Sequence, residues 1–267
     1  MQAASLPATA GWQWARDGFR LFMRQPLALF TWSLVITLLL LFAMFTVPIG
    51  PLFYTTLVPC ITLMTLSACK HIEADRTMLP SMWLKPLQKP GVLKKLLILG
   101  GLYAGLCILA GLIAFVPFSS ELVEGVRAAS VTNDFVPFFE ALHTALLVFG
   151  ALYVIIGALF WHAPVLIAWH NIKLPQALFF SGIACWRNKW AFLVYGLTWA
   201  AVFLGIDFCA GTLISLDVSQ TLVNTVQVPV NIAAFGILYS SFYPAYTSVF
   251  EINNASFQLD DGHGTQA

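Results

Sequence analysis

LALFTWSLVITLLLLFAMFT, residues 27–46, decides the fold of this chain. The stretch contains no charged residue, and a helix of its length spans the roughly 30 Å of hydrocarbon in a bilayer. It is not expected to be a cleaved signal peptide, because its apolar core is too long and no small-x-small cleavage site ends it. The stretch therefore predicts a helix that crosses a membrane.

Further apolar runs of similar length follow along the chain. Charged residues make up 9% of its 267 residues and hydrophobic residues 59%, whereas soluble domains carry about a quarter charged residues. So few charges cannot cover a water-facing surface of this size. We predict an all-α polytopic membrane bundle of six transmembrane helices, forming one domain over residues 1–252 with a disordered tail at 253–267. The predicted spans are residues 27–46, 49–69, 96–116, 141–169, 190–213 and 222–250.

The basic residues fall on one side of these six spans. Twelve of the thirteen lysines and arginines lie before the first span, between the second and third, or between the fourth and fifth, and the remaining one is Arg127. Lysine and arginine are enriched on the cytoplasmic side of membrane proteins. We therefore expect both termini in the cytoplasm. The net charge of +1 leaves no basic face for nucleic acid.

A threefold pattern accompanies the six spans. Each pair of spans follows a partly apolar stretch of about 15 residues, and the returning span of each pair carries a proline. One interpretation is three repeats of an interfacial helix followed by a helical hairpin. The other is the ordinary layout of such a topology, which puts basic stretches before every odd-numbered span. The approach stretches are residues 11–25, 80–94 and 175–189, and the prolines are Pro59, Pro164 and Pro244.

The first approach stretch has two faces on a helical wheel. An apolar face is followed by an adjacent polar one at 100° per residue. A helix lying in the headgroup plane would turn the first face toward acyl chains and its arginines toward anionic phospholipid, the expected partner. The alternative is an ordinary cytoplasmic cap on the first span. The apolar face holds Trp12, Ala15, Phe19, Phe22 and Met23, and the polar face Gln13, Arg16, Asp17, Arg20 and Arg24.

Four residues of the spans are transport candidates. His162 lies roughly two turns inside the membrane boundary, beside Pro164, which should kink the fourth span. Its imidazole would relay a proton or line a substrate path, or it would be neutral and bonded to a carbonyl freed by the proline. Asp207 would lie in a water-filled vestibule, or at the interface if the fifth helix ends early. Tyr243, beside Pro244, would form a polar aromatic wall or simply pack.

Known catalytic motifs are missing from the sequence. It contains no H-E-x-x-H, phosphate-binding loop, nucleophile elbow or dinucleotide fingerprint, and its five cysteines form no C-x-x-C pair. We therefore predict no catalytic residue, metal or cofactor. Gly101-x-x-x-Gly105 fits a close helix–helix contact.

Two functions remain open from these features. The preferred one is a non-catalytic membrane protein that organises lipid or a partner, with a homo-oligomer possible. The alternative is a small-solute or lipid transporter or channel built on the kinked helices, because broken helices often line transport sites.

Two short stretches resemble a known family. One runs Gly11-Trp12-Gln13-Trp14 through Gly18-Phe19-Arg20-Leu21-Phe22 to Arg24-Gln25-Pro26, and the other is Phe180-Ser181-Gly182-Ile183-Ala184-Cys185 followed by Arg187-Asn188. With the six spans, they resemble an uncharacterised family of proteobacterial inner-membrane proteins, best represented in beta-proteobacteria. The layout is also similar to the membrane domain of glycerophosphodiester phosphodiesterase. The resemblance implies the bacterial cytoplasmic (inner) membrane, and it supplies no substrate and no site residues.

Overall fold

The computed structural model describes residues 3–132 and 135–250, and within these ranges every regular element is a helix. Six helices are long and apolar enough to cross a membrane, which confirms the predicted number. The predicted tail at 253–267 lies outside the described residues. The elements are α1 (Ala10–Arg24), α2 (Pro26–Phe45), α3 (Ile49–Glu73), η1 (Pro80–Met82), η2 (Lys85–Gln88), α4 (Val92–Phe115), η3 (Val116–Phe118), α5 (Ser119–Thr132), α6 (Val136–Phe160), α7 (Ala163–His170), α8 (Leu174–Arg187), α9 (Lys189–Ser215) and α10 (Gln220–Phe250).

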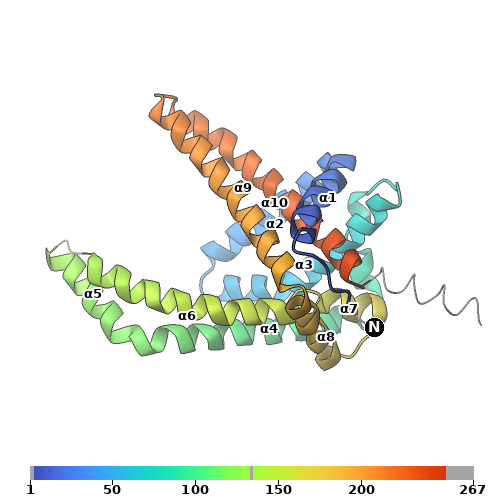
Figure 1. The fold of residues 1–267 in the computed structure, drawn as a ribbon, viewed down its shortest axis with the longest axis horizontal. Helices are drawn as coiled ribbons and strands as arrows, with labels where there is room; N and C mark the ends of the chain where they lie inside the picture. Colours follow the sequence, from blue (N-terminus) through green and yellow to red (C-terminus); the bar gives the residue numbers. More distant parts are fainter. Residues whose placement is uncertain (1–2, 133–134, 251–267) are drawn as a thin grey trace, which may run out of the picture.

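Three helical hairpins extend from one packed region, which we call the hub. The hub consists of α1, η1, η2, α7, α8 and the adjoining ends of the long helices. From it the α4–α6 arm, with α5 at its tip, and the α9–α10 arm diverge, and the shorter α2–α3 hairpin is seen between them (Figure 1). In α9, for example, Leu197, Leu204 and Phe208 are each more than 60% exposed. The arms therefore expose most of their apolar side chains.

The first helix packs into the hub against α9 and α10. Two glycines allow this close approach: a Cβ added to Gly11 would lie 2.1 Å from the carbonyl oxygen of Ala191, and one added to Gly18 would lie 2.4 Å from Cβ of Ser241. Larger residues at these positions would push the helices apart. The buried side of α1 comprises Ala10, Gly11, Trp14, Ala15, Gly18, Leu21 and Phe22.

The approach stretches differ from one another. The first and third are the helices α1 and α8, as predicted. The second, residues 80–94, holds only the two short 3₁₀ helices before α4 begins at Val92, so the helix expected there is a wrong prediction. Its prolines explain the difference, because Pro86 and Pro90 lack the backbone N–H that a continuous helix needs. Gly91, at φ 77°, then turns the chain into α4.

Candidate functional site

The predicted kink in the fourth span is a complete break between α6 and α7, just before Pro164. The backbone N–H of His162 donates to the hydroxyl of Ser181 over 3.0 Å, and that hydroxyl donates to the carbonyl oxygen of Ala158 over 2.8 Å. In an unbroken helix the N–H of residue 162 would reach the carbonyl of residue 158 directly. Ser181, from α8, is therefore inserted into the hydrogen-bond ladder and satisfies both groups.

The imidazole of His162 is enclosed by aromatic rings. The side chain is 1% exposed, and its ring centroid lies 5.1 Å from that of Phe250, 5.9 Å from that of Tyr246 and 6.1 Å from that of Phe192. Among the described residues, Nε2 has no hydrogen-bond partner. The carbonyl that Pro164 frees is that of Phe160, and the predicted bond from Nε2 of His162 to it is not made.

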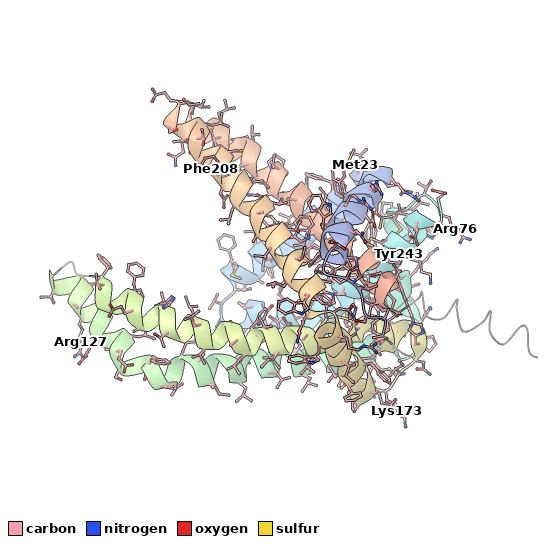
Figure 2. All side chains as sticks on the ribbon, in the orientation of Figure 1. Met23, Arg76, Arg127, Lys173, Phe208 and Tyr243 are labelled. Atoms are coloured by element: carbon pink, nitrogen blue, oxygen red, sulfur yellow. The ribbon has the colours of Figure 1, made fainter. Side chains whose placement is uncertain are left out.

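Tyr243 connects α10 to the end of α3. The side chain is 3% exposed, and its hydroxyl donates to Oε2 of Glu73 over 2.5 Å. Figure 2 shows Tyr243 in the hub, on the side where Arg76 lies. One turn further along α10, the hydroxyl of Tyr246 and Nε2 of His170 are 2.7 Å apart. The tyrosines around Pro244 thus bind side chains of two other helices.

Asp207 lies apart from this cluster, on the α9–α10 arm. Its Oδ1 accepts a hydrogen bond of 2.7 Å from Nε2 of Gln227 in α10, and the pair is exposed. The early end of the fifth helix expected near Asp207 is not observed, because α9 continues to Ser215. The four transport candidates therefore do not form one site: His162, Pro164 and Tyr243 lie in the hub, and Asp207 lies on an arm.

The outward face of α1 carries the lipid-interface candidates. Trp12 is 56% exposed and Phe19 49%, and Met23 is exposed beside them. Ala15 and Phe22, which were predicted to share this apolar face, are instead buried in the hub. The exposed apolar ridge is therefore narrower than the helical wheel suggested.

The arginines of α1 lie next to that ridge. Nε of Arg16 and Nη1 of Arg20 lie 3.4 Å and 3.3 Å from Oδ1 of Asp17, all three side chains being exposed. Arg24 pairs with the exposed Asp75, in the loop that follows α3, over 3.2 Å. Arg16 and Arg20 are thus left at the surface with one carboxylate between them.

Sequence reasoning missed Asn188, which ties the start of the chain to the hub. Its side chain is 1% exposed. Oδ1 accepts from the N–H of Leu6 over 2.8 Å, and Nδ2 donates to the carbonyl oxygens of Ala4 and Ala184 over 2.8 and 2.9 Å. Ala4 in turn donates to the carbonyl of Val249. In the sequence, the one feature that could have pointed to Asn188 was its position as a lone asparagine between two apolar helices.

Two hollows on the described surface are well defined by their lining, and the lining of these two contains neither His162 nor Pro164. The first, of about 480 Å³, lies between Trp12 and the apolar side of α9 around Leu197. The second, of about 240 Å³, lies between α3, η2 and α7 and includes Lys85 and Lys89 in its lining.

The charges are segregated along the molecule. Twelve of the thirteen lysines and arginines belong to elements of the hub or to the loops that join them. Arg127 lies at the tip of the α4–α6 arm, opposite Lys173 and Arg76 (Figure 2). The end of the molecule that carries the basic residues is thus the packed end, and the arm tips are the end with almost none.

Comparison with known proteins gives one extended relationship. The chain is 33% identical over 261 residues to a probable inner membrane protein of Burkholderia thailandensis, and the alignment covers 94% of this chain and 95% of the relative. No family model and no solved structure matches the chain.

Proposed function

We propose that this multi-pass inner membrane protein organises surrounding lipid without catalysing a reaction. The chain belongs to the same family as the probable inner membrane protein of Burkholderia thailandensis. The divergence of the α4–α6 and α9–α10 arms carries the proposal (Figure 1). Their flanks are apolar and uncovered: Val154 of α6 is 70% exposed, and Leu204 and Phe208 of α9 are 68% and 76% exposed. In a bilayer such flanks take up lipid, or a membrane protein that binds between them.

The basic residues of the hub favour one orientation in the membrane. With the hub at the cytoplasmic face, its basic residues meet the anionic headgroups of the inner leaflet, and the arm tips lie on the opposite side. The resemblance to the membrane domain of glycerophosphodiester phosphodiesterase stays a prediction. So does the threefold repeat, which the helices α1 and α8 support and the short 3₁₀ helices of the second approach stretch do not.

The lengths of the helices suit a splayed arrangement. At about 1.5 Å per residue, the 27 residues of α9 measure roughly 40 Å and the 24 residues of α4 roughly 36 Å. Crossing about 30 Å of hydrocarbon would tilt them by about 40° and about 35°, at the upper end of observed tilts. By contrast, α2, with 20 residues, matches the hydrocarbon thickness when upright.

The outward face of α1 supports the same proposal. Trp12, Phe19 and Met23 form an exposed apolar ridge on a helix that is already packed against α9 and α10. Arg16 and Arg20 lie beside this ridge and would meet lipid phosphates. Because α1 is held in place by its glycine contacts, it can fix lipids in a defined position beside the arms.

Extraction of the protein in polymer nanodiscs, without detergent, tests the proposal. The lipids around the protein should be enriched in anionic phospholipid relative to the bulk membrane, and Arg16→Gln/Arg20→Gln should reduce that enrichment. Arg127→Gln, at the arm tip, is the control and should leave it unchanged. A lipid shell with bulk composition and no co-isolated membrane protein would overturn the proposal.

Transport is the second candidate, and the unpartnered Nε2 of His162 at the helix break favours it. In proteoliposomes, His162→Phe should then abolish uptake of a solute that the wild type accumulates. If the wild type accumulates none of the tested solutes above protein-free vesicles, transport loses its support. Under the lipid-organising proposal, His162→Phe leaves the anionic lipid shell unchanged.

A further inference from the structure

The hollow of about 240 Å³ lies where the cytoplasmic end of α3 meets α7 and the linker to α4. Its apolar lining residues include the buried Leu63 and the half-buried Trp169, together called the floor, and Ser67 supplies a hydroxyl. Its rim is basic, since Lys85 and Lys89 of the linker both line it. The hollow therefore combines an apolar base with a positively charged opening.

A third lysine, Lys70, contacts one of the residues that line this hollow. Nζ of Lys70 lies 4.7 Å from the centroid of the Trp169 ring, over its face. The lining includes no acidic residue. Within residues 3–132 and 135–250, Lys70, Lys85 and Lys89 take part in none of the ion pairs. Two lysines thus line the hollow and a third contacts its Trp169 ring, and no acidic residue lines it.

The linker that carries these lysines is held in place. Trp83, between η1 and η2, stacks on Trp32 of α2 with ring centroids 4.3 Å apart and an interplanar angle of 15°. The indole of Trp32 also donates to the hydroxyl of Thr65 in α3 over 2.8 Å. Because α3 contributes Leu63 and Ser67 to the hollow, these contacts attach the linker backbone that carries Lys85 and Lys89 close to the helix that lines it. The basic rim belongs to a positioned site rather than to a free loop.

We propose that this hollow, called the lysine pocket, binds the phosphodiester headgroup of one anionic phospholipid. Phosphate oxygens would lie against Lys85 and Lys89, and the acyl chains would follow the apolar wall of α3 and α7 toward the hydrocarbon. The floor and the rim distinguish this ligand from a free anion, because a soluble phosphate would use the lysines and leave Leu63 and Trp169 unused. A basic pocket between transmembrane helices at the cytoplasmic side suits a lipid headgroup.

This inference rests on the proposed function in one respect, since it needs the hub at the cytoplasmic leaflet. It goes further by assigning one lipid to one place. The lipid shell and the site-bound lipid are measured separately, so each can fail alone. If the site-bound lipid is absent while the lipid shell is enriched in anionic phospholipid, only the lysine pocket is contradicted. If the shell has bulk composition while the site-bound lipid is present, only the proposed function is contradicted.

Native mass spectrometry of the full chain, titrated with phosphatidylglycerol, tests the lysine pocket. Lys85→Gln/Lys89→Gln should weaken the first binding step roughly 30-fold, at about fivefold for each lysine near a phosphate. Lys94→Gln/Lys173→Gln removes the same charge from exposed positions of the hub outside the lining. This control should bind phosphatidylglycerol as the wild type does.

Three results would overturn the inference. Equal weakening in both double variants would mean that attraction is spread over the hub. Equal affinity of the wild type for phosphatidylglycerol and neutral phosphatidylcholine would mean that the pocket does not recognise the charge of the headgroup. Displacement of bound lipid by inorganic phosphate at millimolar concentration would assign the pocket to a soluble anion. Circular dichroism of each variant confirms that it keeps the helical content of the wild type.

Discussion

The hydroxyl of Ser181 accepts a hydrogen bond of 3.0 Å from the backbone N–H of His162 and so bridges the break between α6 and α7. Pro164, two residues later, has no N–H to offer the carbonyl of Phe160, and the ladder cannot close there. A side chain from α8 thus stabilises a discontinuity in the membrane-spanning segment at 138–170. Breaks of this kind are tolerated at membrane depth only where neighbouring groups satisfy the backbone.

Ser181→Ala should destabilise the protein. The substitution leaves the N–H of His162 and the carbonyl of Ala158 without the bridging hydroxyl in a fully buried place, at about 1–3 kcal/mol. The midpoint of thermal unfolding in detergent, followed by circular dichroism, should fall. Ser215→Ala is the matched control, because the Ser215 hydroxyl binds only a carbonyl of its own helix and is exposed. A midpoint equal to that of the control would show that the bridge contributes nothing.

Gly18→Ala should displace α1 from the hub. The new Cβ would lie 2.4 Å from Cβ of Ser241 and 2.5 Å from its Cα, so a backbone must move, at a cost of about 1–3 kcal/mol. The expected readout is a lower unfolding midpoint together with faster proteolysis within α1. Gly105→Ala is the control, since a Cβ there meets nothing within 4 Å and alanine favours a helix by up to about 1 kcal/mol. Equal effects of the two substitutions would contradict the close packing of α1.

Cysteine labelling in a cysteine-free background should reveal the orientation. With the hub in the cytoplasm, Lys173→Cys should react with a membrane-impermeant maleimide only in inverted vesicles, and Arg127→Cys only in spheroplasts. The opposite pattern would reverse the proposed topology.

The native thiol of Cys185, on α8, should react poorly in the same experiment. Burial raises the pKa of the Cys185 thiol to about 12. The thiolate is the reactive form, so it is scarce at pH 7 and its reactivity increases only as the pH rises toward that value. Restoring Cys185 alone should therefore give almost no labelling at pH 7, and rapid labelling there would contradict its burial.

Disulfide cross-linking should report the divergence of the arms in the membrane. Phe203→Cys/Phe235→Cys joins α9 to α10 within one arm, where the two ring centroids lie 4.9 Å apart, and it should cross-link efficiently under mild oxidation. Val154→Cys/Leu204→Cys places one cysteine on each arm, at strongly exposed positions, and this pair should not cross-link. Efficient intramolecular cross-linking of the second pair would show that the arms close against each other in a bilayer.

Much of the fold could be predicted because the bilayer imposes strict rules on a sequence. Without water in the hydrocarbon, the backbone must satisfy itself within each helix, so apolar runs such as residues 27–46 identified the spans directly. The prediction of a helix over 80–94, made from the threefold pattern, was wrong because Pro86 and Pro90 interrupt a helix there. The contact expected at Gly101 and Gly105 also failed, since the close approach to α3 is made at Gly100, against Thr56.

The candidate sites depended on contacts that no single stretch of sequence contains. His162 and Pro164 were recognisable because an ionisable residue beside a proline in an apolar run is unusual. Their partner Ser181 lies 19 residues away from His162 on another helix, and serine is common in membrane helices. The lysine pocket was hidden for the same reason: Lys85 and Lys89 contributed to the charge asymmetry, but Leu63 and Trp169 lie beside them only after folding.

The sequence by itself determined that residues 27–46 and five other segments form helices able to cross a membrane. The length and polarity of a segment alone decide whether it can enter the hydrocarbon. Only the tertiary structure decided how the six helices share space. Lipid is as apolar as the side chains it contacts, so no hydrophobic driving force selects one arrangement of helices over another. Close packing at Gly11, Gly18 and Gly100 and the hydrogen bonds made by Ser181 and Asn188 contribute to that choice.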